Sequence, residues 1–318
     1  MTYVSSSAHR PSVSPPRCPI PSFGDVESRV FLDVVSEQGV ESSWGVTTSD
    51  AKIYECPRSG LRFREPASKE KIEAFYGQTY HDSMVGSADD AARTRAYRKE
   101  NAERIRYLQR FRKSGRVLDI GCSTGLFASQ LAGAGFDAYG SDISEYACGE
   151  AEKALGPGKV LRGSLDDLAA AHRGTFDVVT MMDVIEHFED VVTPLRRIHD
   201  LLVPGGVLFV RTPTLRSPFY KVADLSYRLT LGRYRSAILK IYHAEHFYFF
   251  TEQAMQALVK DTAFDLLSID TDPLLWENFR SAEMRQGPLV NAVLGAVYFL
   301  GRAAGRGHGM KVVARKPV

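Results

Sequence analysis

This sequence has few cysteines, no long apolar run and no excess of charge of one sign. Its 40 Lys and Arg residues nearly balance 38 Asp and Glu, so the formal net charge of +2 gives no general attraction to nucleic acid or to a membrane surface. A start without a basic and then apolar segment predicts no secretory signal. The four cysteines are widely scattered, which argues against a disulfide framework and favours a reducing cytoplasm; they are Cys18, Cys56, Cys122 and Cys148.

The longest apolar stretch runs from about Leu289 to Leu300. It is shorter than the roughly 20 residues that a membrane-spanning helix needs. We therefore expect a buried helix, with an interfacial or dimer-forming helix as the alternative.

Composition divides the 318 residues into three parts. Residues 1–24 are rich in Ser and Pro without periodicity, which indicates a flexible arm. Residues 25–88 hold short β-like pieces, among them 51–55 and 61–64, and are expected to form a small N-terminal subdomain. Residues 89–318 are expected to form the main domain, which opens with a long helix.

After Gly115, short β-branched runs alternate with helical segments. This order predicts an α/β fold, namely a Rossmann-like, doubly wound, mostly parallel seven-stranded sheet with helices on both faces. Strands are expected at 116–120, 137–140, 159–161, 176–181, 207–211, 264–270 and 311–315.

An insert at 213–250 interrupts the alternation and is rich in aromatic residues. A long segment above strand ends is often a functional lid, and we expect this one to influence substrate choice. A helical hairpin whose aromatic side chains form a satellite core is an equally compatible structure. The aromatic residues of the insert before His246 are Phe219, Tyr220, Tyr227, Tyr234 and Tyr242.

The strongest motif is Val117 to Gly125, where an apolar strand runs into a glycine-bearing turn and a helix. Glycine lets the backbone turn sharply and approach a ligand closely. Asp142 follows the next strand, where an acidic residue can accept both hydroxyls of a ribose. The spacing of Gly121 and Gly125 departs from the dinucleotide fingerprint, and Asp119 suits an ammonium group better than a pyrophosphate.

In these residues the chain resembles the class I S-adenosylmethionine-dependent methyltransferases, over about Arg116 to Thr212. It is most similar to the ubiquinone-biosynthesis O-methyltransferases and to bacterial enzymes of sugar and natural-product tailoring. The segments that carry the resemblance, in family order, are 117–125, Asp142, 163–166, 176–179, 183–187 and 202–206.

The resemblance implies S-adenosylmethionine as cofactor, S-adenosylhomocysteine as product and no metal. Asp119 would lie near the amino group, Asp142 would hold the ribose, and Ile143 would pack on the adenine. A segment around Tyr80 resembles one that closes over the cofactor. The implied cofactor-binding residues are Tyr80, Asp119, Gly121, Cys122, Ser123, Gly125, Asp142, Ile143, Leu165, Asp166, Met182 and Asp183.

Methyl transfer from a sulfonium is a direct displacement, in which the protein supplies position and electrostatics. A nearby base helps the nucleophile to lose its proton, and histidine suits that task near neutral pH. Three histidines are candidates, His187, His243 and His246. Each could instead brace a loop or pack beneath the insert. A metal site at His243, Glu245 and His246 lacks a known ligand spacing and is not expected.

Two further features have competing interpretations. Cys18 and Cys56 resemble zinc-ribbon knuckles that have each lost the second cysteine, so we expect no metal there and a fold held by packing. The basic helix from Arg93 to Arg116 could bind RNA, but a solvated face is favoured because no aromatic platform accompanies it.

The sequence thus predicts a cytoplasmic enzyme that methylates a small molecule, at a hydroxyl oxygen of a natural-product or sugar intermediate. Nitrogen or carbon as the acceptor atom stays open. RNA or protein as substrate, and a module that binds the cofactor without turnover, are the alternatives. Nucleic acid is not the favoured partner, and a homodimer is an open expectation.

Overall fold

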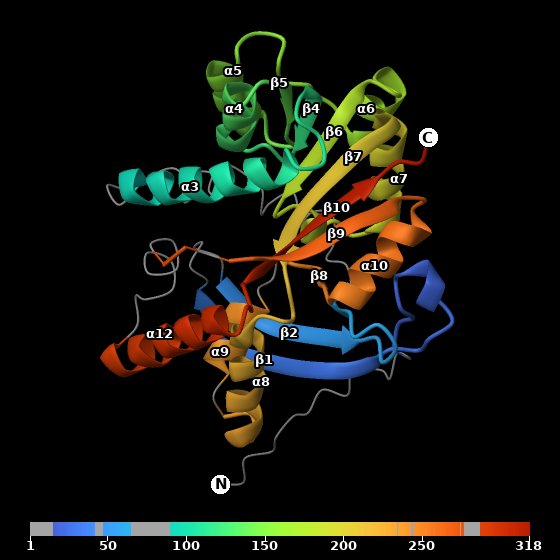
Figure 1. The fold of residues 1–318 in the computed structure, drawn as a ribbon. Coiled ribbons are helices and arrows are strands. Elements are labelled where there is room, and N and C mark those ends of the chain that lie inside the picture. Colours follow the sequence, from blue (N-terminus) through green and yellow to red (C-terminus); the bar gives the residue numbers. More distant parts are fainter. Residues whose placement is uncertain are drawn as a thin grey trace, which may run out of the picture.

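A six-stranded sheet forms the centre of the molecule (Figure 1). The computed structural model describes residues 15–41, 47–64, 90–233, 235–242, 245–273, 275–276 and 287–318. The strand order is β5-β4-β6-β7-β10-β9; β10 is antiparallel to both of its neighbours, while β5, β4, β6 and β7 are parallel. The strands are β4 (Gly115–Ile120), β5 (Phe136–Ser141), β6 (Phe176–Met182), β7 (Leu202–Pro213), β9 (Asp265–Asp272) and β10 (Gly309–Arg315).

The predicted Rossmann-like α/β architecture is confirmed, although the third expected strand is only a single bridge. Val160 pairs with Gly140 of β5 and forms no longer ladder. Gly156, Gly158 and Gly163 flank this segment with positive φ, so the chain turns away on both sides before a ladder can extend.

Helices cover both faces of the sheet because neighbouring residues of a strand point to opposite sides. Val117 of β4 packs with α3 and α4, whereas Leu118 packs with α6, α7 and α10. Val178 and Val179 of β6 divide in the same way. The helices are α3 (Asp90–Leu108), α4 (Leu126–Gly133), α5 (Glu145–Leu155), α6 (Leu165–Ala171), α7 (Val192–Leu201) and α10 (Glu252–Asp261).

A second, four-stranded sheet lies below the first in Figure 1 and has the order β1-β2-β3-β8. It comprises β1 (Arg29–Glu41), β2 (Thr47–Glu55), β3 (Arg62–Phe63) and β8 (Tyr248–Phe249). Three of these strands come from the N-terminal segment, whereas β8 follows the insert. Phe63 pairs with Tyr248, so residues far apart in sequence complete one sheet.

The insert folds as two helices, α8 (Pro218–Leu229) and α9 (Ser236–Ile241). Tyr220 and Tyr242 are buried with Phe249 and with Ile53 of β2, and the rings of Tyr242 and Phe249 lie 4.8 Å apart. The expected satellite core of aromatic residues is therefore present. Tyr234 lies outside the described residues.

The two N-terminal segments that resemble zinc-ribbon knuckles, at Cys18 and at Cys56, lie together. Cys18 and Cys56 are both buried in the main core with Ile20 and Leu61. Ser59 occupies the position of the missing second cysteine after Cys56, and its hydroxyl lies 3.9 Å from the Cys18 sulfur. Burial raises the pKa of the Cys18 thiol to about 12, so this thiol is protonated at neutral pH.

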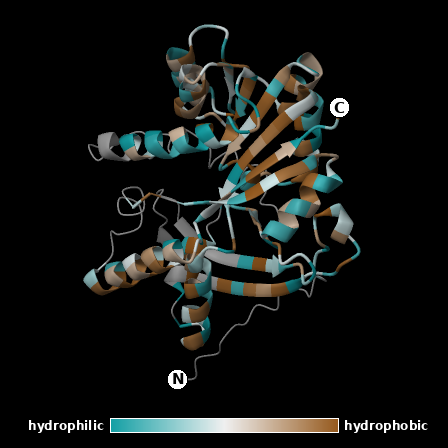
Figure 2. Ribbon diagram, in the orientation of Figure 1, coloured by the Kyte–Doolittle hydropathy of each residue, from teal (hydrophilic) through white to brown (hydrophobic). Residues whose placement is uncertain are grey.

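The expectation that the apolar run from Leu289 to Leu300 forms a buried helix is wrong. The run lies in α12 (Pro288–Ala303), where Leu289 is 79% and Leu300 71% exposed. Only one narrow face, Gly295, Tyr298 and Gly301, is buried. An apolar run alone cannot tell an inner helix from one at the rim of the molecule, and Figure 2 shows this hydrophobic helix projecting from the fold.

Candidate active site

The candidate site lies at the carboxyl ends of β4, β5 and β6. The chain runs from β4 outward to β5 and later returns to β6 on the other side of β4, which makes β4 and β6 the topological switch point. The arrowheads of β6 and β7 point down toward the second sheet (Figure 1). Ligands of open α/β sheets bind at this kind of position.

The turn after β4 has a backbone that needs glycine. Gly121 has φ +69° and Gly125 φ +80°. A Cβ at Gly121 would lie 2.4 Å from a methyl of Val184, so a side chain could not fit. The Gly121 and Cys122 amides donate to the Ser141 carbonyl, at 2.8 and 3.0 Å, which binds the turn to β5. Ser123 also adopts positive φ, at +48°.

Asp142 follows β5 and faces this turn. One carboxylate oxygen accepts from the Ser123 amide at 2.9 Å and the other from the Ser144 amide at 3.0 Å. These two bonds fix the carboxylate at the lip of the glycine turn. The next residue, Ile143, is 76% exposed, so an apolar side chain is presented beside a fixed acid.

Asp119 is a buried carboxylate at the end of β4. It is 2% exposed and accepts a hydrogen bond from the Thr180 hydroxyl at 2.6 Å. Burial, together with the nearby charge of Asp142, raises the pKa of Asp119 to about 7. A cation placed beside it would favour the ionised form, so this acid suits a positively charged ligand group.

Leu165 and Asp166 lie in the first turn of α6, a helix that sequence reasoning missed. Its N-cap, Ser164, forms a capping box with Asp167, and this serine-x-x-acid signal is visible in the sequence. Asp166 accepts an ion-pair hydrogen bond from Arg197 of α7. The Asp166 side chain is therefore already engaged by the protein.

Met182 and Asp183 lie where β6 ends. Asp183 has φ +57° and accepts from the buried Arg211 of β7. Arg211 also donates to Asp272 at 3.0 Å, and Arg104 of α3 donates to the same oxygen at 2.7 Å. This chain of charges was not foreseen, because it joins residues of α3, β7 and β9 that are far apart in sequence.

Asp272 stays ionised in this network. Burial alone would raise its pKa, but the guanidinium groups of Arg104 and Arg211 hold the pKa at about 2. Arg211, buried between Asp183 and Asp272, is thereby held in position beside the end of β6.

His187 and His246 are brought together above this position. Their rings lie 4.7 Å apart at a steep angle. His187 Nδ1 is 2.9 Å from the Glu245 carbonyl oxygen, which can only accept, so Nδ1 carries the proton and Nε2 of the neutral ring does not. Burial lowers the pKa of His187, which favours that neutral ring.

Glu186 is a buried acid that sequence reasoning did not select. It is 1% exposed, and the Thr212 hydroxyl donates to it at 3.0 Å. Burial, followed by the charge of Asp183, raises the pKa of Glu186 to about 8. Glu186, His187 and His246 have potential ligand atoms within 4.8 Å of one another, close enough to share a metal ion.

Two predicted site residues, Tyr80 and His243, lie outside the described part of the chain. The structure otherwise brings the carboxylates and the glycine turn to one place and the two histidines to another beside it.

Comparisons with known proteins identify the family of this chain. A family described as a methyltransferase domain matches residues 92–269, which is more than half of the chain. The ubiquinone biosynthesis O-methyltransferase of Thiobacillus denitrificans is 38% identical over 112 residues, which cover 34% of this chain and 48% of that protein. The enzyme of the same name from Aromatoleum aromaticum is 39% identical over 101 residues, covering 30% and 43%. The chain spans about half the length of these curated relatives.

Two solved structures share the fold. A Haloferax volcanii methyltransferase, solved with the Trm112 activator, has a TM-score of 0.54 and 15% identity, covering 79% of this chain and 100% of that one. A SAM-dependent methyltransferase of Thermotoga maritima has a TM-score of 0.50 and 19% identity, covering 77% and 98%.

Proposed function

This chain belongs to the class I S-adenosylmethionine-dependent methyltransferases, and on that premise we propose that it methylates a small molecule at a hydroxyl oxygen, in a natural-product or sugar intermediate. The observation that carries the cofactor part of the proposal is the pair of carboxylates, Asp119 and Asp142, beside a turn in which Gly121 leaves no room for a side chain. His187 supports the choice of a hydroxyl.

The residues of the turn fit the cofactor by their chemistry. Asp119 is buried with a raised pKa and would be stabilised by the amino group of the methionyl end. Asp142 is oriented by two backbone amides and would accept both ribose hydroxyls. Ile143 is exposed beside it and would pack on the adenine ring. The bound cofactor supplies an activated methyl group on a sulfonium sulfur.

His187 is the base that the geometry favours. Its Nδ1 proton is held by the Glu245 carbonyl, so Nε2 can take the proton from an acceptor hydroxyl while the oxygen attacks the methyl carbon. The bound cofactor would supply the methyl group to that oxygen and would keep the electron pair of the carbon–sulfur bond. His246, whose ring meets that of His187, would orient the ring or serve as the base in its place.

Oxygen is favoured as the acceptor because a neutral hydroxyl needs a base, and because the curated relatives named above are O-methyltransferases. To test the proposal, the protein is incubated with cofactor labelled in the methyl group and with metabolite extracts. We expect labelled small molecules in the mass spectrum, and labelling of RNA or protein alone would contradict the proposal.

Replacing Asp142 with asparagine is expected to weaken cofactor binding by about 10- to 100-fold, because hydrogen bonds to a charged group are worth roughly 1.5–3 kcal/mol. Titration calorimetry with S-adenosylhomocysteine measures the change. Asp137→Asn is the matched control, since Asp137 lies at the start of β5, the strand that Asp142 follows, and pairs with Lys159 and Arg116. Equal affinity of the Asp142 variant and the control would show that the ribose site is elsewhere.

Treatment with a chelator is expected to leave the rate of methyl transfer unchanged, because a histidine base needs no metal. The measurement compares turnover before and after dialysis against EDTA, followed by addition of Mg²⁺ or Zn²⁺. Loss of turnover that a metal restores would instead identify Glu186, His187 and His246 as a metal site, and the role of His187 as a base would then be wrong.

A further inference from the structure

Two helices at the rim of the molecule expose apolar side chains that the proposed chemistry does not use. They are α8 with the turn that follows it, and α12; together we call them the rim face. The exposed apolar residues of this face are Val222, Leu225, Leu229, Leu231, Leu289, Val290, Val293, Phe299 and Leu300.

The two helices meet near one point and diverge from it. A Cβ on Gly301 of α12 would lie 2.6 Å from the Pro218 ring of α8, so the backbone of α12 packs directly against the proline that begins α8. From this contact α8 and α12 run in different directions (Figure 1). Two helix axes that meet at a point define a plane, so one flat surface can contact both α8 and α12.

The end of α8 has an unusual residue for an exposed helix terminus. The Gly232 amide bonds to the Tyr227 carbonyl and the Leu231 amide to the Arg228 carbonyl, which is the bond pattern of a Schellman C-terminus. Glycine usually occupies the left-handed position of this motif. Here that position is Leu231, with φ +51° and 90% exposure.

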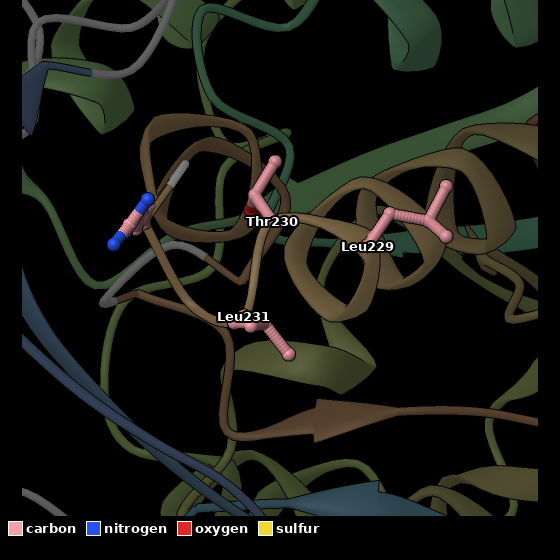
Figure 3. A pocket seen from close by; sticks show the side chains of 4 residues that line it. Leu229, Thr230 and Leu231 are labelled. Atoms are coloured by element: carbon pink, nitrogen blue, oxygen red, sulfur yellow. The ribbon is translucent and has the colours of Figure 1, made fainter.

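Leu231 thus combines a strained backbone with an exposed apolar side chain, and neither contributes to folding. Leu229, 75% exposed, lies beside it, and with Thr230 and Arg233 these residues line an open hollow of about 440 Å³ (Figure 3). Strained backbone of this kind is concentrated at functional sites, which motivates a search for a role of this residue.

The rim face is also basic, in a chain that is nearly neutral. Residues 218–233 and 288–303, which form the rim face, hold four Lys or Arg and one acidic residue, whereas the whole chain has 40 and 38. The single acid, Asp224, pairs with Arg62 of β3. The four basic residues of the face are all exposed; they are Lys221, Arg228, Arg233 and Arg302.

We infer that the rim face docks on the surface of a membrane that contains anionic lipids. Exposed leucines next to Arg and Lys are the chemistry of an interfacial helix, whose apolar side enters the acyl boundary while its basic groups meet lipid phosphates. A second copy of the face would bring like charges together. RNA would leave the leucines exposed to water. None of the described helices is long and apolar enough to cross a membrane, so the contact is peripheral.

Sedimentation with vesicles tests the inference. The full chain is mixed with vesicles of phosphatidylcholine, with or without phosphatidylglycerol. We expect binding to the vesicles that contain phosphatidylglycerol, weaker binding to the neutral ones, and release as salt is raised, because salt screens the lipid charge. Methyl transfer is not the readout, so the result is independent of the proposed function.

Leu231→Gly separates binding from folding. Glycine relieves the left-handed strain, so the melting temperature should stay the same or rise, while vesicle binding should weaken by about tenfold through the lost leucine. Arg228→Glu combined with Arg233→Glu should weaken binding by at least about tenfold. Val318→Gly is the control, because Val318 is fully exposed at the other end of the molecule and should bind as the unaltered chain does.

Three results would overturn the inference. The first is equal binding to neutral and anionic vesicles, or no binding to either. The second is unchanged binding of the Leu231→Gly and the double arginine variants. The third is a dimer in light scattering that these substitutions dissociate, or RNA that binds the face in place of vesicles.

Discussion

Replacing Arg211 with methionine is expected to lower the free energy of unfolding by roughly 3–5 kcal/mol, which is the usual cost of removing one partner from a buried ion pair. Arg211 is 5% exposed and lies between Asp183 and Asp272. Without the guanidinium, the carboxylate of Asp272 keeps Arg104 but loses its second short ion pair. Urea unfolding followed by circular dichroism gives the value.

The matched control is Arg173→Met, because Arg173 pairs with Asp200 on the surface at 73% exposure and should cost less than about 1 kcal/mol. A double variant with Asp272→Asn should cost less than the sum of the two single changes, since the two side chains interact. If Arg211→Met costs no more than Arg173→Met, the network does not stabilise the fold.

The same network predicts how the stability of the fold changes at acidic pH. The pKa of Asp272 is held at about 2, below its usual value near 3.8, so its contribution to stability is present above pH 4 and is lost as the pH falls toward 2. In the Asp272→Asn variant this part of the acid dependence should be absent.

Replacing His187 with alanine is expected to reduce kcat by about 10²- to 10⁴-fold, the range that general-base catalysis supplies. The pKa of His187 is lowered by burial, so the unaltered enzyme keeps the neutral ring to a pH below 6.5. Its kcat should stay level through neutral pH and fall only on the acid side of that value. In the variant this acid limb should disappear.

Two measurements separate a base from a bracing residue. Added imidazole should restore part of the activity of His187→Ala, since a small base can enter the space, but it would not repair a loop. His172→Gln, at the end of α6, should keep full activity. If the acid limb of the pH profile is unchanged in the His187 variant, the general base is His246 or another group.

The sequence predicted the parts of the site that lie within one short segment. Val117 to Gly125 contains strand, turn and helix start in nine consecutive residues, and its glycines report backbone angles directly. Asp142 could be placed because it ends the next strand. Parallel strands bring their carboxyl ends to one edge, so the topology completed the prediction.

The parts that the sequence did not reveal depend on distant partners. Asp272 meets Arg104 across 168 positions of the chain, and no local pattern pairs charges over that distance. Glu186 lies within the motif at 183–187, but the sequence alone does not distinguish a buried glutamate from one at the surface. Only short β-like pieces were expected in residues 25–88, so the 13-residue strand β1 was not foreseen.

The rim helix shows a different limit. The run from Leu289 to Leu300 was expected to be buried because apolar residues usually are. The structure turns only Gly295, Tyr298 and Gly301 inward. The apolar character of a segment indicates that removing it from water is favourable. It does not indicate whether the rest of the chain or a phase other than water covers the segment.

The short strand β8 has a consequence for synthesis on the ribosome. β3 can pair with β2 as soon as both have emerged, but its other edge must wait for Tyr248 and Phe249, most of a chain length later. Until then the edge of β3 that later pairs with β8 has no partner strand. Unpaired strand edges promote association between nascent chains. A stop codon or a pause before residue 248 should therefore yield aggregates rather than a folded N-terminal fragment.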